Sequence, residues 1–299
     1  MEMIGLDIHK KNTWATVLDD DGNIVERRRF DSRTEAIKEF IQGHQNSKVA
    51  LEATGIFEHF YKTLRSCGVQ VLVANPLKTR LIAEAKVKTD KIDSRTLAQL
   101  MYADMLPESY VADDETRDAR KDVRERLLMK KISTSLKNHI YSELLRRGLE
   151  YKDGVLGTKT GRRWAKQILS EPRLDQAFDI LENTEASIAE YNKERLEPAY
   201  ERNEQAQLIA SIPGVGEYSA LTIAAELGDI SRFSNTDKVV SYCGLNPGVS
   251  QSGPHVKYGH ITKTGPRSLR WILIETANMH LLHCRNKKPP IGRNDSRSA

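Results

Sequence analysis

Three short runs rich in strand-forming residues open the chain and restrict its first part to a small set of folds. Met3–Ile8, Asn12–Leu18 and Asn23–Phe30 follow one another, and Asp19-Asp20-Asp21-Gly22 between the last two is a strong hairpin-turn signal. Runs of this kind in succession predict an antiparallel meander of three strands.

Strand and helix patterns alternate after this meander. Ser32, followed three residues later by Glu35, has the pattern of a capping box and predicts that a helix begins there. Lys48–Ala53 and the almost wholly apolar Val69–Ala74 predict two more strands, the second of them buried on both faces. Helices are expected over 57–66, 77–87 and 90–105. The first part of the chain is therefore predicted to be an α/β mixed sheet covered by helices.

The middle of the chain has a different character, with long charged stretches and almost no strand signal. Apolar residues recur there at three-to-four spacing, first at Val123, Leu127, Leu128, Ile132, Leu136, Ile140 and Leu144, then at Leu174, Phe178, Leu181, Ile188 and Tyr191. Narrow stripes on charged helices are typical of coiled-coil packing, within one chain or between chains. We therefore expect three domains: residues 1–112, a helical coiled-coil linker and dimerisation region 113–205, and a mainly helical domain 206–299.

Composition excludes several classes of protein. Hydrophobic residues make up 39% of the 299 residues, which suffices for a buried core, and no apolar run approaches the ~20 residues of a membrane span. The N-terminus has no secretory signal pattern. Cys67, Cys243 and Cys284 lie far apart and fit neither a disulfide framework nor a Cys-x-x-Cys zinc site. A cytoplasmic protein without a membrane partner is expected.

Positive charge gathers at the C-terminal end. The formal net charge is +5, and residues 1–112 and 113–205 each carry equal numbers of acidic and basic side chains. From Gly244 onward the basic residues outnumber Glu275 and Asp295; they are Lys257, Lys263, Arg267, Arg270, Arg285, Lys287, Lys288, Arg293 and Arg297. A basic segment of this kind indicates a polyanion partner, although a solvated tail is the plainer interpretation of residues 285–299.

Four carboxylates stand out by their positions. Asp7 and Glu52 lie at the ends of two expected strands, and Asp90 and Asp93 lie three apart at the start of an expected helix, on one face. Clustered carboxylates repel one another unless cations neutralise them, and hard oxygen ligands favour Mg²⁺ or Mn²⁺. Two such ions can hold the attacking and leaving oxygens of a phosphodiester displacement. Taken singly, each acid has a plainer role in a helix cap, a surface or a turn.

Two motifs in the last third concern nucleic acid. Pro213-Gly214-Val215-Gly216 joins two expected helices, and in a helix-hairpin-helix Gly214 and Gly216 would let the backbone approach phosphate; a tight turn is the alternative. Ser252 precedes Gly253-Pro254 in an expected loop over 244–264, followed by Lys257, Lys263, Arg267 and Arg270. A serine hydroxyl there could attack a phosphate held by these cations if His255, His260 or a metal-bound hydroxide took its proton.

A helix is expected from Arg267 to about His283. His280, His283 and Cys284 are spaced to share one of its sides, but no further ligand pair is apparent. They are interpreted as core or surface residues rather than zinc ligands.

Three of these segments together resemble the Asp-Glu-Asp-Asp transposases of bacterial insertion sequences. They are Met3-Ile4-Gly5-Leu6-Asp7-Ile8-His9-Lys10, Leu51-Glu52-Ala53-Thr54-Gly55 and Lys88-Thr89-Asp90-Lys91-Ile92-Asp93-Ser94-Arg95. The N-terminal domain of that family has a ribonuclease H fold similar to RuvC-type junction resolvases. Gly244-Leu245-x-Pro247 with Gln251-Ser252-Gly253 resembles the family's segment that carries a nucleophilic serine, which maps onto Ser252, with Ser250 the neighbour most easily confused with it.

The resemblance implies a transposase or site-specific recombinase of a mobile element. Asp7, Glu52, Asp90 and Asp93 would be its catalytic quartet holding Mg²⁺ or Mn²⁺, and Ser252 of one subunit would attack DNA, with the quartet of the same or another subunit assisting. The family also implies a non-coding guide RNA, assembly of dimers into a tetramer, and association with the nucleoid when DNA is bound.

Three alternatives stay open at this point. The first is a metal-dependent Holliday-junction-type nuclease in which Ser252 is only structural. The second is a sugar kinase or actin-like ATPase, but those enzymes need a glycine where His9 stands. The third is a DNA-binding protein without catalytic activity, for which Asp7 would be dispensable.

Overall fold

The chain folds into two compact units, Met1–Val111 and Ala112–Ala299, and each is described by itself. The structure is a computed structural model that describes residues 1–82, 90–253 and 255–286. The expected division of the second unit between residues 205 and 206 stays a prediction.

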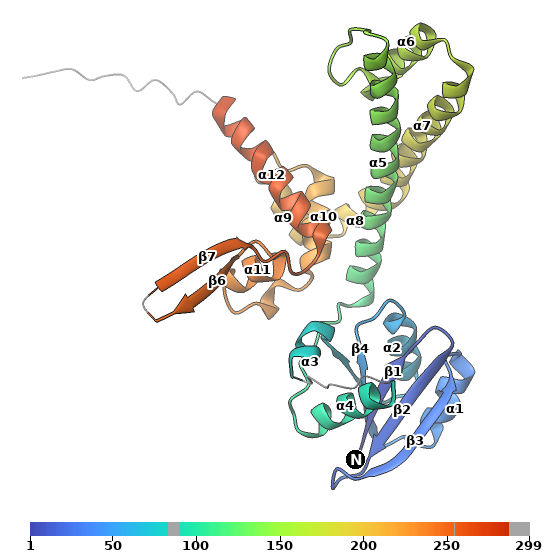
Figure 1. Ribbon diagram of the computed structural model, residues 1–299, viewed down its shortest axis with the longest axis vertical. Coiled ribbons are helices and arrows are strands. Elements are labelled where there is room, and N and C mark those ends of the chain that lie inside the picture. The colour runs from blue at the N-terminus through green and yellow to red at the C-terminus, as the bar shows by residue number, and fades with distance from the viewer. Residues whose placement is uncertain (83–89, 254, 287–299) are drawn as a thin grey trace, which may run out of the picture. The chain divides into compact units, whose positions relative to one another are not determined.

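The first unit is built on a five-stranded sheet in the order β3-β2-β1-β4-β5 (Figure 1). The strands are β1 (Glu2–Ile8), β2 (Asn12–Leu18), β3 (Ile24–Asp31), β4 (Ser47–Glu52) and β5 (Gln70–Ala74). β2 runs antiparallel to β1 and to β3, whereas β4 runs parallel to both β1 and β5. The expected fold class, a mixed sheet with helices followed by a mainly helical region, is confirmed.

Helices cover both faces of this sheet. Ile4, Leu6 and Ile8 of β1 lie in one core with side chains of α1 (Thr34–Gln42) and α2 (Phe57–Ser66). α4 (Asp90–Tyr102) packs on the opposite face through Leu97 and Met101. α3 (Pro76–Ile82) follows β5. The helix expected over 77–87 therefore begins at Pro76, and its residues 83–87 lie outside the described part of the chain.

The capping box predicted at Ser32 is wrong. α1 begins at Thr34, and its N-cap is Arg33, whose side chain makes no capping hydrogen bond. The Ser32 hydroxyl lies 2.6 Å from the carbonyl oxygen of His9 and 2.8 Å from the Thr13 hydroxyl, so it fastens β3 to the turn between β1 and β2 instead. A tertiary contact has overridden a local pattern.

The second unit begins with a long antiparallel helical pair, α5 (Asp114–Arg146) and α7 (Pro172–Tyr191), which pack on each other (Figure 1). Ile140 and Leu144 of α5 share a core with Phe178 and Leu181 of α7, as the apolar stripes predicted. The connecting elements are η1 (Val155–Gly157) and α6 (Lys159–Leu169), and α7 continues into a π-helical turn, η2 (Asn192–Leu196), and α8 (Glu197–Glu201).

Four further helices and a short 3-10 turn complete the second unit. They are α9 (Glu204–Ala210), α10 (Glu217–Leu227), η3 (Ile230–Arg232), α11 (Thr236–Cys243) and α12 (Arg267–Asn286). α10 contacts α5, α9 and α12, so it lies at the centre of this part of the unit. In the described ranges, no helix combines the length and the apolar character that crossing a membrane requires.

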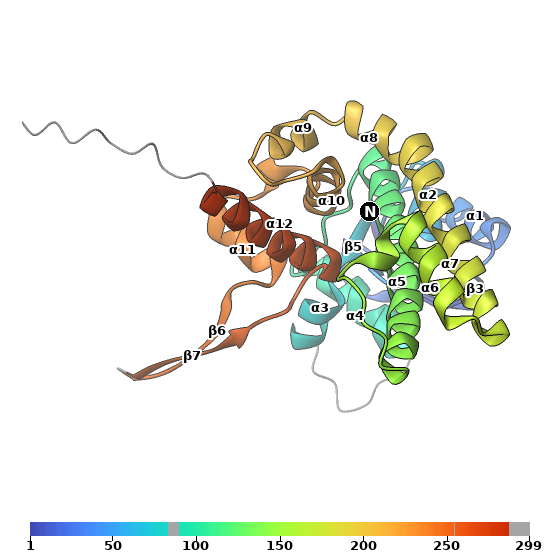
Figure 2. The same cartoon turned by 90° about the horizontal axis from the view of Figure 1, so that it is seen from above.

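The expected loop over 244–264 is a β-hairpin, which corrects the sequence prediction. β6 (Pro247–Ser252) pairs antiparallel with β7 (His255–Ile261). Both views show this hairpin extending from the helices of its own unit (Figure 1, Figure 2). The Gly, Pro and Ser content concealed a strand pair that contains the β-branched Val249, Val256 and Ile261 and the aromatic Tyr258.

Candidate functional site

Asp7 and Glu52 lie at one edge of the sheet because their strands are parallel neighbours. Leu6 of β1 pairs with Leu51 of β4, and Asp7 and Glu52 stand one residue further along each strand. Leu6 and Leu51 both belong to the core under α1 and α2. Since successive side chains of a strand alternate between faces, the register assigns both carboxylates to the opposite face, which α4 covers.

Gly5 allows α4 to lie directly against β1. A side chain at this position would place its Cβ 2.0 Å from the carbonyl oxygen of Ser94 and 2.6 Å from the amide nitrogen of Ala98. The buried hydroxyl groups of Ser94 and Thr16, 2.9 Å apart, tie the same turn of α4 to β2. Sequence reasoning missed Gly5, although a glycine in an otherwise apolar strand is a signal of close backbone approach.

The direction of α4 brings its acidic first turns to the edge where Asp7 lies. Its last residue, Tyr102, lies beside Gly22 at the far end of β2, where Leu18 pairs with Met3 of β1. α4 therefore runs opposite to β1, and its N-terminal turns, which carry Asp90 and Asp93, lie at the C-terminal end of β1. The side chain of Asp90 is outside the described part of the structure.

The carboxylates of this edge have the donor chemistry of a hard divalent cation, because all of them offer oxygen ligands. Asp7 is 19% exposed, and its Oδ2 lies 3.1 Å from Nε2 of His9. Among the described side chains, which exclude Asp90, no three of His, Cys, Asp or Glu lie close enough together to hold a metal ion. The donor types therefore fit Mg²⁺ or Mn²⁺, and the convergence of all four stays a prediction.

Ser252 is the last residue of β6, and its backbone pairs with His255, the first residue of β7. Ser250 pairs with Lys257 in the same ladder. Residues two apart in a strand lie on one face, so the register assigns Ser250, Ser252, His255 and Lys257 to a single face of the hairpin. The side chain of Ser252 lies outside the described part of the structure. Because Ser250 and Ser252 lie on the same face, the register does not decide which of them is the nucleophile.

Polar contacts hold the base of the hairpin against α11 and α12. One guanidinium nitrogen of Arg270 donates to the carbonyl oxygens of Cys243, at 3.2 Å, and Thr264, at 3.1 Å. A Cβ at Gly265 would lie 1.9 Å from the Tyr242 carbonyl oxygen, so this position requires glycine. Arg270, expected to bind nucleic acid, is thus engaged with the backbone at the base.

Glu226 of α10 connects this base to α5, and sequence reasoning missed it. Its carboxylate is fully buried and accepts two hydrogen bonds of 2.8 Å from Arg124. It also accepts a hydrogen bond from the Ser268 hydroxyl in the first turn of α12. Hydrogen bonding to Glu226 raises the pKa of Arg124. The sequence feature that could have indicated a buried and paired Glu226 is a carboxylate inside an otherwise apolar expected helix, Tyr218–Leu227.

The glycine turn between α9 and α10 is packed against α12. Gly214 has φ +88°, and a Cβ there would lie 2.9 Å from the backbone of His280. Nδ1 of His280 lies 2.7 Å from the Pro213 carbonyl oxygen. Position 214 therefore requires glycine for packing on α12. Gly216 is the N-cap of α10, with open space where a side chain would be.

The remaining predicted cations lie on or near the hairpin. Lys257 is exposed on β7, and Lys263 has the left-handed φ of 56° just beyond it. Arg267 is the first residue of α12. None of these placements tests their expected contact with nucleic acid, which stays a prediction.

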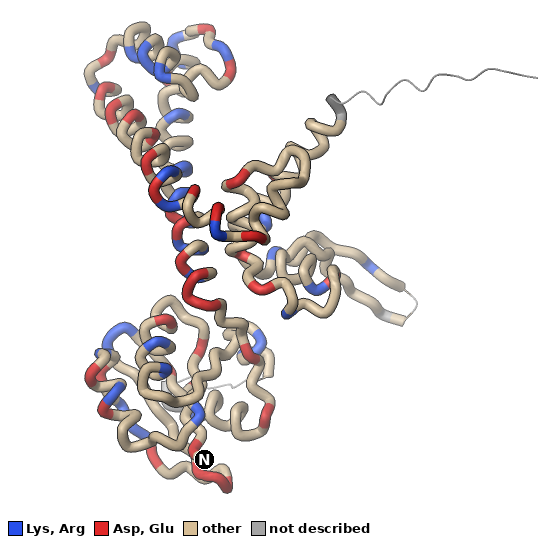
Figure 3. The backbone as a smooth tube through the Cα atoms, turned by 180° about the vertical axis from the view of Figure 1, so that it is seen from behind, with Lys and Arg blue, Asp and Glu red and all other residues tan. Residues whose placement is uncertain are grey.

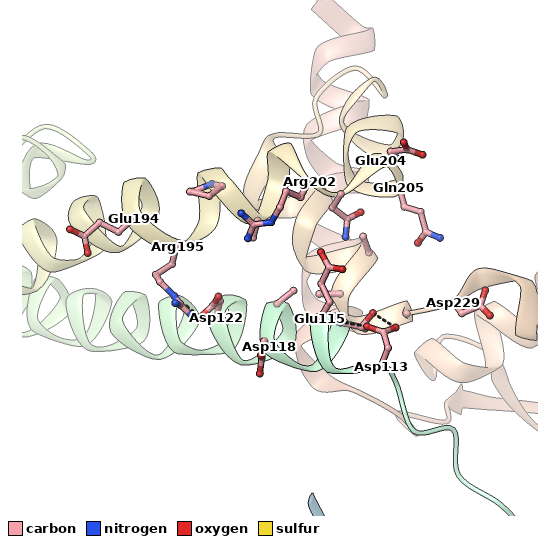
Figure 4. A pocket seen from close by; sticks show the side chains of 18 residues that line it. Asp113, Glu115, Asp118, Asp122, Glu194, Arg195, Arg202, Glu204, Gln205 and Asp229 are labelled. Atoms are coloured by element: carbon pink, nitrogen blue, oxygen red, sulfur yellow. Dashed lines mark hydrogen bonds and ion pairs between the residues drawn. The ribbon is translucent and has the colours of Figure 1, made fainter. Parts of the chain in front are cut away.

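A cavity of about 900 Å³ lies elsewhere in the second unit, between α5, η2, α8 and α9, with mostly acidic labelled side chains (Figure 4). Two acids of the lining are engaged within the fold: Asp113 caps α5 by accepting from the Thr116 amide, and Asp122 accepts from Tyr191 and Arg195. The backbone hydrogen bond from Thr116 lowers the pKa of Asp113. A negatively charged lining of this kind disfavours a polyanion.

Two family profiles match the chain. The one described as "Transposase IS116/IS110/IS902 family" matches residues 206–290, and the one described as "Transposase", of the Asp-Glu-Asp-Asp type, matches residues 4–147. The motifs at Asp7, Glu52, Asp90 and Asp93 lie within the second range, and Ser252 lies within the first.

Named relatives agree with these profiles. The chain is 26% identical to the transposase for insertion sequence element IS1111A of Coxiella burnetii, over 96% of this chain and 80% of that protein. It is 27% identical to a probable family 20 transposase of Pseudomonas aeruginosa, over 96% and 86%. The structure of T. thermophilus RuvC in complex with a Holliday junction substrate aligns with 36% of this chain and 99% of RuvC at a TM-score of 0.28 and 10% identity.

The chain is thus a transposase, a member of the enzyme class that cuts and rejoins DNA. It belongs to the IS116/IS110/IS902 transposase family, in the group whose N-terminal region is of the Asp-Glu-Asp-Asp type.

Proposed function

We propose that the chain recombines the DNA of its mobile element through a serine nucleophile, Ser252, assisted by a carboxylate quartet that holds Mg²⁺ or Mn²⁺. The observation that carries this proposal is the shared edge of β1 and β4. Asp7 and Glu52 lie there on the face that α4 covers, and the first turns of α4 bring Asp90 and Asp93 to the same end.

Asp7, Glu52, Asp90 and Asp93 would hold the cation, which when bound would stabilise negative charge on a phosphodiester and lower the pKa of a bound water. The protein supplies the support. β1 and β4 are held in register by the sheet, and α4 is held on β1 by the absence of a side chain at Gly5. Carboxylates on such elements keep their spacing without help from substrate.

The serine step is a transesterification. The Ser252 Oγ forms a bond to phosphorus while the bond from phosphorus to the leaving sugar oxygen breaks. The serine proton passes to a base, and the leaving oxygen takes up a proton. Reversal of this step by a sugar hydroxyl of another strand rejoins the DNA and releases Ser252, so no external energy source is required.

The ladder register favours His255 over His260 as the base. His255 pairs directly with Ser252, whereas His260 lies beyond the register shift at Pro247 and Val249, further along β7 from the serine. Lys257 shares the serine face and would bind the phosphate. We propose that Lys263, Arg267 and Arg270, with Gly214 and Gly216, also serve nucleic-acid binding, although Gly214 and Arg270 have packing roles of their own.

The proposal includes further parts that the family resemblance supports. They are a non-coding guide RNA, assembly of dimers into a tetramer through region 113–205, and association with the nucleoid while DNA is bound. The exposed Leu128 and Ile132 on α5 support an interchain role for that region, because they continue an apolar stripe beyond the α5–α7 core.

The test is a covalent trap. The purified chain is incubated with Mg²⁺, candidate guide RNA and element-end DNA, denatured, and examined for protein linked to DNA. An adduct is expected with the wild type and with Ser250→Ala, and none with Ser252→Ala. Cleavage that persists in Ser252→Ala without any adduct would favour the alternative, a metal-dependent junction nuclease. An adduct that disappears only in Ser250→Ala would move the nucleophile to that residue.

A further inference from the structure

The β6–β7 hairpin has two chemically different faces. One carries Ser250, Ser252, His255 and Lys257, as described above. On the other face, Val249 pairs with Tyr258 and Gln251 pairs with Val256. We call Val249, Val256 and Tyr258 the apolar face of the hairpin. The proposed attack by Ser252 involves residues of the first face only, so it does not explain why the apolar face carries exposed apolar side chains.

The apolar face is open. Val249 is 58% exposed, Val256 44% and Tyr258 70%, and every residue of β7 is exposed. Within the described residues, therefore, no other element of the chain covers this face. A two-stranded hairpin without packing is marginally stable in water, so the hairpin gains stability when a partner covers the apolar face.

The charge around the hairpin identifies the kind of partner. From Gly244 to Ile274 the sequence contains no Asp or Glu, while it contains Lys257, Lys263, Arg267 and Arg270. In Figure 3 the hairpin accordingly shows blue for basic residues and no red for acidic ones. An uncompensated positive segment with an exposed aromatic ring matches a polymer that offers phosphates and flat apolar surfaces side by side, which is a nucleic-acid strand.

We propose that the apolar face is a DNA contact in which the Tyr258 ring stacks on a base and Val249 and Val256 pack against the adjoining sugar and base edges. The inference rests on the proposed function for the identity of the strand as DNA. Stacking on one face fixes the position of the strand against the hairpin while Lys257, on the other face, attracts its phosphates. Tyr258 is then a positioning residue for the phosphate that Ser252 attacks.

The test measures DNA affinity of the full-length chain by fluorescence anisotropy over a range of salt concentrations. The probe is a fluorescein-labelled mixed-sequence DNA strand, alone and in a duplex, with an RNA strand of the same sequence for comparison. The variants are Tyr258→Ala, Tyr258→Phe, which retains the ring, and Lys257→Gln. Leu208→Ala is the matched control, because Leu208 is 73% exposed on α9 of the same unit.

Tyr258→Ala is expected to weaken DNA binding about 5- to 100-fold without changing its salt dependence, because stacking releases no counterion. Tyr258→Phe and Leu208→Ala should stay close to the wild type. Lys257→Gln is expected to reduce the slope of log affinity against log salt by about 1.

Any of four results would overturn the inference. Wild-type affinity in Tyr258→Ala, with the expected salt effect in Lys257→Gln, would remove the stacking contact and leave DNA binding by the hairpin intact. A change of sedimentation coefficient in Tyr258→Ala with unchanged DNA affinity would make the apolar face a protein interface. Weakening that is confined to the RNA strand would assign the face to RNA. If the wild type binds no DNA, the proposed function fails as well.

Discussion

The acidic edge of the first unit and the serine hairpin of the second are supported in different ways. β1 and β4 lie inside a sheet with helices on both faces, and their inward residues Leu6 and Leu51 are fully buried. Within the described ranges β6 and β7 pair only with each other, and every residue of β7 is exposed. The sheet fixes the positions of Asp7 and Glu52, whereas under our proposal the hairpin gains its support from a partner.

Under the proposed function, this difference has a chemical reason. Carboxylates that share a cation must be held close together against their mutual repulsion, which requires rigid supports. A nucleophile that first attacks and is later displaced must approach and leave the phosphate. In the second unit, the hydrogen bonds of Arg270 and Glu226 and the close packing at Gly265 restrain the base of the hairpin.

The largest effect is expected from Asp7→Asn. The variant keeps the size of the side chain and removes a charged ligand, so cleavage of element-end DNA should fall at least about 1000-fold, as expected when several kcal/mol of transition-state stabilisation is lost. Glu39→Gln, an exposed change on α1, is the matched control and should cleave normally. Normal cleavage by Asp7→Asn would mean that the acidic edge does not take part in catalysis.

Glu226→Ala should be strongly destabilising, because it leaves the guanidinium of Arg124 and the nearby Arg120 without their buried partner. Because Arg124 is half exposed, the expected cost is about 1–3 kcal/mol, that of leaving buried hydrogen-bonding groups without a partner. Urea unfolding measures the free-energy change, with Glu217→Ala in the first turn of α10 as the control. A loss below about 1 kcal/mol would show that Glu226 is not needed to hold α5, α10 and α12 together.

Hydrogen exchange compares the local stability of the β1–β4 edge with that of the β6–β7 hairpin directly. Amides of β1 and β4 should exchange at least about 100-fold more slowly than those of β6 and β7 in the free protein, because local opening of an unpacked hairpin requires little free energy. Addition of DNA should slow exchange in β6 and β7 selectively. Equal protection of both regions without DNA would contradict the proposed difference.

The smallest effect concerns Glu185 of α7. Partial burial alone would raise its pKa, but hydrogen bonds from Lys137 and Ser133 and the charges of Lys130 and Lys137 outweigh burial and lower the pKa to about 2. A carboxylate whose pKa is lower in the folded state than in the unfolded state stabilises the fold when the pH is above the unfolded-state pKa. This contribution disappears as the pH falls from about 4.5 to about 2.

Acid unfolding of Glu185→Gln tests this coupling in the α5–α7 pair. The variant should be less stable than the wild type at neutral pH, by about 1 kcal/mol after allowance for solvent screening, and the difference should vanish near pH 2. Circular dichroism melts at several pH values measure it. A difference that is independent of pH would show that the ionised form of Glu185 has no special role.

The sheet was predictable because its signals are local. Alternating or wholly apolar runs located the five strands to within about two residues. The sequence predicted that Asp7 and Glu52 lie at strand ends, and these ends share an edge only if the two strands are neighbours, as β1 and β4 are in the structure. The direction of α4 was not predictable, because it depends on the close approach of Ser94 and Ala98 to Gly5.

The less predictable features depend on contacts between distant segments. Ser32 lost its capping role because the carbonyl oxygen of His9 and the hydroxyl of Thr13 lie beside its hydroxyl in the folded sheet. The hairpin was expected as a loop because Gly, Pro and Ser outweighed Val249, Val256 and Ile261 in the pattern. Gly214 was assigned to phosphate contact, although its packing against α12 was visible only in the fold.

Binding of Mn²⁺, followed by electron paramagnetic resonance during titration of the full-length chain, tests the central role of the acidic edge most directly. The wild type should bind the ion saturably, Asp7→Asn and Glu52→Gln should lose this binding, and Asp118→Asn, an exposed acid beside the acidic cavity, should retain it. Saturable binding that survives in Asp7→Asn and Glu52→Gln, or disappears in Asp118→Asn, would contradict the account.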